Sequence, residues 1–166
     1  MSSVAFAAVA AGSLIATVID VRTRRIPNVL TATMASVGIG LAAFGISGLS
    51  IWGSVVGLLV GLALMLPGHL LGATGAGDVK LMAAIGAIVG PALVFSAFLF
   101  SALAGGVLAV AVALRRRRLS ATLAGTGRLM AAPAGARQEI RAATAANRFA
   151  YGPAIAAGSV IATLLG

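Results

Sequence analysis

The sequence has no cysteine and only three acidic residues. Its 166 residues include two aspartates, Asp20 and Asp78, one glutamate, Glu139, and one histidine, His69. Without cysteine the chain can form no disulfide bond, no thiol nucleophile and no cysteine-ligated zinc site. Only 9% of the residues are charged, whereas about a quarter are charged in typical soluble domains. Chemistry that depends on a carboxylate is therefore restricted to three side chains.

The sequence is rich in apolar residues: 60% are hydrophobic and the mean hydropathy is +1.10. Several runs approach the roughly 20 residues that a helix needs to cross a bilayer. These runs are continuous and lack the alternation of transmembrane strands. We therefore expect an all-α, polytopic membrane protein with one membrane-embedded domain over residues 1–166. The first apolar run lacks the basic start of a signal peptide and continues to Ile19, so we expect it to be retained as a span.

Six transmembrane helices are predicted. The fourth and fifth are separated by Gly90-Pro91, a turn signal that also places a proline in the first turn of the fifth helix. The fourth is the shortest and covers only about half of the hydrocarbon core. The predicted spans are about Val4–Asp20, Val29–Ile46, Ile51–Leu71, Val79–Val89, Pro91–Leu114 and Ala150–Leu165.

The positions of the twelve Lys and Arg residues support six spans, because this number places all of them on one side. They are Arg22, Arg24 and Arg25 after the first span, Lys80 after the third, and a basic segment at about 115–149 after the fifth. By the positive-inside rule this side is cytoplasmic, and both termini are outside. Membrane topology thus accounts for the net charge of +9, and no nucleic-acid partner is expected.

In this topology both aspartates lie at the cytoplasmic face, since Asp20 ends the first span and Asp78 opens the fourth. An ionisable residue at membrane depth is a functional candidate by default. Two adjacent carboxylates share a proton, so that one acts as a general base on water while the other hydrogen-bonds the scissile carbonyl and supplies a proton. This chemistry needs no metal, thiol or serine triad. Gly75 and Gly77 lack side chains and would let a substrate backbone approach Asp78.

Each of these features also has a structural interpretation. Asp78 could cap a helix that begins at Val79, and Asp20 could form an ion pair with the arginines that follow it. The glycines could belong to a loop or to close helix packing. Pro27 could start or kink the second span, and Asn28 could cap it.

Two other functions compete with the protease hypothesis. A small proton-coupled transporter would use Asp20 and Asp78 as proton relays. It predicts acidic residues near mid-span and an internal repeat, and neither is visible in the sequence. A non-catalytic membrane assembly subunit, held together by small residues, would tolerate the loss of either aspartate. The protease hypothesis is preferred because it explains why the only two aspartates share one membrane face.

Two sequence motifs resemble those of the type IV prepilin peptidases. The first is Asp20-Val21-Arg22 followed by Arg25-Ile26-Pro27-Asn28. The second is Gly75-Ala76-Gly77-Asp78-Val79-Lys80-Leu81, which resembles the GxGD signature shared more distantly with preflagellin peptidases and presenilin-type proteases. The closing stretch FAYGPAIAAG looks like the last span of the family. The resemblance covers most of the chain, and the two motifs are specific when they occur together.

The resemblance implies a catalytic dyad of Asp20 and Asp78 that uses no metal or other cofactor. The implied substrate is the leader of a pilin-like precursor, cut just before its apolar helix at the cytoplasmic face of a bacterial inner membrane. Lys80 would balance charge near Asp78, and Arg22 would do the same near Asp20. As a physical hypothesis, the residues expected to bind substrate or support the dyad are Gly75, Gly77, Lys80, Arg22, Pro27 and Asn28.

The sequence also departs from the larger members of that family. Those members carry an extra cytoplasmic domain with a cysteine zinc cluster, and many also methylate the new N-terminus. This chain has no cysteine and no comparable insertion, so it resembles the short form associated with tight-adherence (Flp-type) pili. Cleavage is expected, while methylation and the oligomeric state are left open. The segment at about 115–149 is expected to be a basic amphipathic element that binds anionic lipid headgroups or an acidic residue of the pilin helix.

Overall fold

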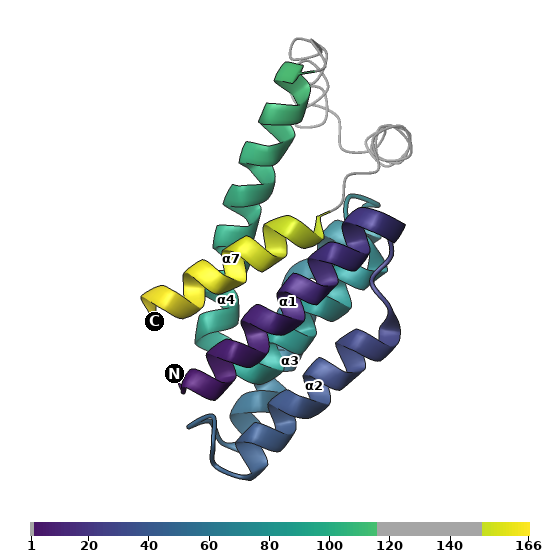
Figure 1. Cartoon of the computed structure of the whole chain (residues 1–166). Coiled ribbons are helices and arrows are strands. Elements are labelled where there is room, and N and C mark those ends of the chain that lie inside the picture. Colours follow the sequence, from purple (N-terminus) through teal and green to yellow (C-terminus); the bar gives the residue numbers. More distant parts are fainter. Residues whose placement is uncertain (1, 116–150) are drawn as a thin grey trace.

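The described part of the chain is built from α-helices. The computed structural model describes residues 2–115 and 151–166, whose helices pack into one bundle (Figure 1). The all-α prediction is confirmed for these residues, whereas the predicted basic segment at about 115–149 lies almost wholly outside them. The helices are α1 (Ser3–Thr23), α2 (Asn28–Ala43), α3 (Ile51–Leu70), α4 (Ala76–Arg115) and α7 (Gly152–Leu165).

Local sequence signals account for where these helices begin and end. The Ser2 hydroxyl accepts a hydrogen bond from the N–H of Ala5 at the start of α1, and Ser50 caps α3 in the same way, as serine commonly does at this position. α2 begins directly after Pro27, whose φ of −63° suits a helix start. α1 ends at Arg24, which adopts a left-handed conformation with a φ of 53°.

The helix α4 is broken at Gly90, where φ is 83° and ψ is 175°. A positive φ is readily adopted only by glycine, and Pro91 then begins the second half. The chain reverses direction here, so that the first half of α4 runs through the bundle and the second half returns along its side and projects beyond it (Figure 1). The predicted turn at Gly90-Pro91 is therefore confirmed, but the first half begins at Ala76 and not at the predicted Val79.

Among the residues that the structure describes, three helical stretches are long and apolar enough to cross a membrane: α1, α3 and Ala76–Ala111. The remaining helices α2 and α7 are apolar but have only 16 and 14 residues. Together these helices identify a membrane protein. Six spans and an outside position for both termini remain predictions.

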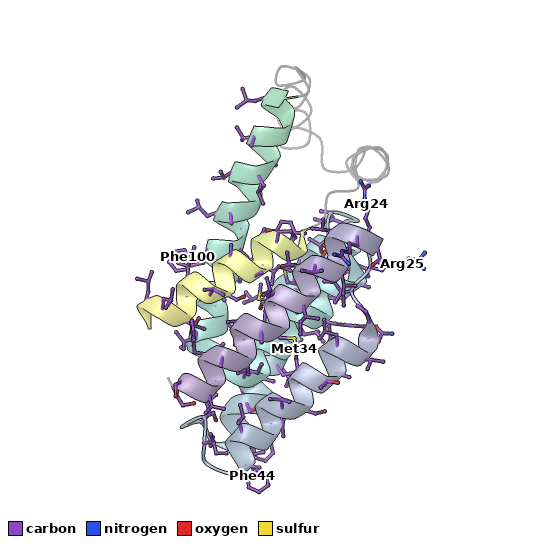
Figure 2. The ribbon with its side chains drawn as sticks, in the orientation of Figure 1. Arg24, Arg25, Met34, Phe44 and Phe100 are labelled. Carbon is purple, nitrogen blue, oxygen red and sulfur yellow. The ribbon has the colours of Figure 1, made fainter. Side chains whose placement is uncertain are left out.

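The two ends of the bundle differ in chemistry. Ser2 and Leu93 line one cavity, and Gly166 packs against Leu93, so both termini lie at the same end (Figure 1). Arg24 and Arg25 extend from the opposite end, away from Phe44 at the end of α2 (Figure 2). We call this arginine-bearing end the basic end of the bundle.

The first half of α4 forms the centre of the bundle, since every residue from 81 to 90 is buried. Small residues let its neighbours approach closely, as is common in membrane helix pairs. A Cβ atom on Gly57 of α3 would clash with the carbonyl of Gly86, and one on Gly38 of α2 would stand 2.7 Å from the carbonyl carbon of Ala87. The buried Ser54 hydroxyl donates to the carbonyl oxygen of Ala87 at 2.6 Å. This packing fixes the position of α4 and of the aspartate in its first turn.

Candidate active site

Asp20 lies in the last part of α1, at the basic end, and only 6% of it is exposed. Its Oδ2 accepts a hydrogen bond of 3.0 Å from the backbone N–H of Gly152, 132 residues away in the sequence. Gly152 is the first residue of α7, so its N–H has no partner within that helix. The positive end of the α7 dipole favours a carboxylate at this position. Asp20 therefore joins the end of α1 to the start of α7.

Asp78 lies in the first turn of α4 and is 8% exposed. Its Oδ2 accepts a hydrogen bond of 3.0 Å from the backbone N–H of Gly75, the residue before the helix. An acidic side chain that reaches back in this way forms one half of a capping box. Asp78 therefore does cap the helix, as considered above. It does so from the first turn of the helix and not from the residue that precedes the helix.

The two carboxyl groups lie at the same end of the bundle. They come from helices far apart in the sequence, and each lies within electrostatic range of the other. Each uses Oδ2 to accept a glycine N–H, and no hydrogen bond within residues 2–115 and 151–166 uses Oδ1 of either group. Two buried carboxylates in mutual range cannot both ionise without cost, which favours a shared proton.

The ion pair considered for Asp20 is not supported by the geometry. Asp20 is buried, whereas Arg22, Arg24 and Arg25 are exposed. Figure 2 shows the side chains of Arg24 and Arg25 extending away from the bundle. The backbone of Gly152 holds Asp20 in place of an arginine. Within residues 2–115 and 151–166, no direct contact between Arg22 and Asp20 supports the proposed charge-balancing role of Arg22.

Each of the two glycines of the second motif has a close neighbour at the position where a side chain would begin. A Cβ atom on Gly77 would stand 3.0 Å from the Cβ of Ile26, and one on Gly75 would stand 3.2 Å from Oδ2 of Asp78. Ile26 is 9% exposed and packs into the core. Gly77 thus provides room for the first motif to pack on the second, and the approach of a substrate backbone to these glycines stays a prediction.

A second contact between the motifs joins Lys80 to Asn28. The Nζ of Lys80 donates to Oδ1 of Asn28 at 2.9 Å. Asn28 is the first residue of α2 and makes no side-chain cap there, while Pro27 occupies the cap position. The predicted capping role of Asn28 is therefore wrong, because its side chain binds α4. Pro27 does precede the helix directly, as predicted, and Lys80 donates to an amide oxygen.

The Lys80–Asn28 hydrogen bond gives a prediction of moderate size. Lys80→Met and Asn28→Ala should each lower the activity of the site by about two- to twelvefold, because a hydrogen bond contributes roughly 0.5–1.5 kcal/mol. The double variant should be no worse than the worse single variant, since both changes remove the same contact. Additive losses in this double-mutant cycle would mean that the two side chains act separately.

Two residues of the site were missed by the sequence analysis as site residues, namely Tyr151 and Gly152. Tyr151 is half-buried: its hydroxyl donates to the carbonyl oxygen of Ser101 at 3.2 Å, it packs on Gly105, and it lies within electrostatic range of Asp78. A Cβ atom on Gly152 would stand 2.8 Å from Oδ2 of Asp20. The Gly-Pro pair that opens the last predicted span was the available signal, since it marks a helix start with unpaired N–H groups.

The described residues contain no group of three or more His, Cys, Asp or Glu side chains that could hold a metal ion. A comparison with protein-family models gives a match to the type IV leader peptidase family over residues 7–110. This range is more than half of the chain and contains Asp20, Asp78 and both motifs. Comparisons with curated proteins and with solved structures gave no significant match.

Proposed function

The chain belongs to the type IV leader peptidase family, a family of membrane-embedded proteases, and from this premise we propose a specific reaction. The protein is a membrane aspartic endopeptidase that removes the leader of type IV pilin-like precursors. The observation that supports the proposal is that Asp20 and Asp78, two buried carboxyl groups from α1 and α4, lie within electrostatic range of each other and are each bound by one backbone N–H.

The reaction follows from a proton shared by the dyad. The ionised carboxylate takes a proton from water as the water oxygen attacks the carbonyl carbon of the scissile peptide bond. The protonated carboxyl hydrogen-bonds the carbonyl oxygen and gives up its proton as the tetrahedral intermediate forms. Transfer of a proton to the peptide nitrogen then breaks the C–N bond and leaves an acid and an amine. Fixing Oδ2 of each group keeps the reacting oxygens in position.

The position of the site supports a cut at the cytoplasmic face. Arg24, Arg25 and Lys80 occupy the same end of the bundle as the dyad, and the positive-inside rule assigns such an end to the cytoplasm. The protein would lie in a bacterial inner membrane, where the apolar helix of the precursor stays in the lipid and its leader reaches the dyad. The absence of cysteine fits the short, tight-adherence form. Anionic lipid headgroups would contact the segment at about 115–149.

The test is co-expression of the chain with a tight-adherence pilin precursor in a host that lacks its own leader peptidase. Wild-type protein should convert the precursor to a shorter product whose N-terminus lies just before the apolar helix. N-terminal sequencing of the product identifies the cut. If the precursor stays intact while the protein accumulates in the membrane, this substrate assignment is wrong, and proton uptake into vesicles then tests the transporter alternative.

A further inference from the structure

Buried hydroxyl groups lie at the contact between α1 and α7. Ser13 of α1 and Ser159 of α7 are both 0% exposed. Their Oγ atoms, and the buried Oγ1 of Thr17, have no hydrogen-bond partner in the part of the chain that the structure describes. Leaving a hydroxyl unpaired in an apolar interior costs roughly 1–3 kcal/mol. Three such groups in one region point to a polar occupant.

The geometry of the helix pair places two of these hydroxyls opposite each other. α1 and α7 run antiparallel (Figure 1), and Asp20 contacts Gly152. Ser13 precedes Asp20 by seven residues, and Ser159 follows Gly152 by seven. Seven residues are close to two helical turns. Ser13 therefore lies on the same face of α1 as Asp20, and Ser159 lies on the same face of α7 as Gly152, each about 10 Å further along its helix. Ser13 and Ser159 therefore face each other across the helix pair.

Thr17 connects this pair to the candidate active site. It lies one turn from Ser13 and one turn from Asp20 along α1, the spacing at which helical side chains are neighbours. Hydroxyl groups thus follow one face of α1 from Ser13 to the carboxyl group of Asp20. Ala16, between Ser13 and Thr17 along α1, is also buried.

We propose that the contact between α1 and α7 binds ordered water, held by the hydroxyls of Ser13, Thr17 and Ser159 and continuing to Asp20. A buried water needs two to four polar partners, and these side chains offer both donors and acceptors. This role of the water rests on the proposed function. The water gives Asp20 a route for proton exchange from inside the bundle while substrate covers the other side of the carboxyl group. It also satisfies hydroxyl groups that would otherwise be buried at a cost.

The lack of cysteine allows a direct test by thiol labelling. Ser13→Cys and Ser159→Cys are purified in lipid vesicles and treated with a small, water-soluble methanethiosulfonate, beside Val9→Cys as the control. Val9 is equally buried but belongs to the apolar core. A thiol in apolar surroundings stays protonated and unreactive. Both serine-derived thiols should react about tenfold or more faster than the control thiol, and equal, slow reaction of all three would overturn the proposal.

A second variant separates a wet contact from a dry one. In a dry contact, Ser13→Ala with Ser159→Ala removes two unpaired hydroxyls and should leave thermal stability unchanged or raise it. In a hydrated contact the double variant loses bound water, so its melting temperature should fall and leader cleavage should slow by about tenfold. Higher stability with unchanged cleavage would contradict the proposal. The labelling needs no catalysis, so its failure is distinct from a failure of the proposed function.

Discussion

Asp20→Asn and Asp78→Asn should each abolish leader cleavage while the protein accumulates normally in the membrane. Asparagine is close in size and its amide oxygen can still accept the N–H of Gly152 or Gly75. It cannot hold or pass the shared proton, so the rate should fall by at least about 10³-fold. The measurement is the fraction of precursor processed with time, at equal membrane levels of each variant.

The third carboxylate of the chain provides the matched control. Glu139→Gln makes the same chemical change in a residue that has no assigned role in the dyad, and it should process precursor at the wild-type rate. Normal cleavage by either aspartate variant would rule out the aspartic mechanism. Loss of protein from the membrane would instead indicate that the carboxyl groups are needed for folding or stability.

Gly152→Ala should also reduce activity strongly, although it changes no charged group. The new Cβ would stand 2.8 Å from Oδ2 and 3.1 Å from Cβ of Asp20, so α7 or the carboxyl group must move. A shift of about 1 Å in a reacting group can cost about 10²-fold in rate. Overpacking of a tight contact also destabilises by about 1–3 kcal/mol. Cleavage rate and melting temperature should therefore both fall.

Gly40→Ala is the matched control for this variant. Gly40 lies within α2, and a Cβ atom there meets nothing within 4 Å. Alanine at this position should leave cleavage unchanged and stabilise the helix by up to about 1 kcal/mol. If Gly152→Ala is as active as Gly40→Ala, the close packing of Gly152 against Asp20 is not needed for cleavage.

The sequence predicted the parts of the fold that depend on local chemistry. Apolar runs gave the helices, Gly90-Pro91 gave the reversal within α4, and the scarcity of acidic residues drew attention to Asp20 and Asp78. The start of α4 was placed too late, at Val79, because glycines before Asp78 indicate a loop when only propensity is considered. In the structure the carboxyl group of Asp78 closes back on Gly75, and the helix begins at Ala76.

The contacts that build the site could not be predicted in the same way. A glycine in the sequence can indicate that another group packs closely against the backbone, but it does not indicate which residue supplies that group. Ile26 packs against Gly77, and Asp20, 132 residues away in the sequence, packs against Gly152. The partner of Asn28 was missed for a similar reason, since its position at the start of α2 suggested a local cap and its amide instead binds Lys80.

Cleavage by the purified chain is the most direct test of the account. A synthetic peptide that contains a pilin leader and the first turns of its apolar helix is incubated with wild type, Asp20→Asn or Asp78→Asn in detergent, and the products are weighed by mass spectrometry. Wild-type protein should give two peptides from a single cut before the apolar helix, and both variants should leave the peptide intact. Products from either variant, or an intact peptide with folded wild-type protein, would contradict the account.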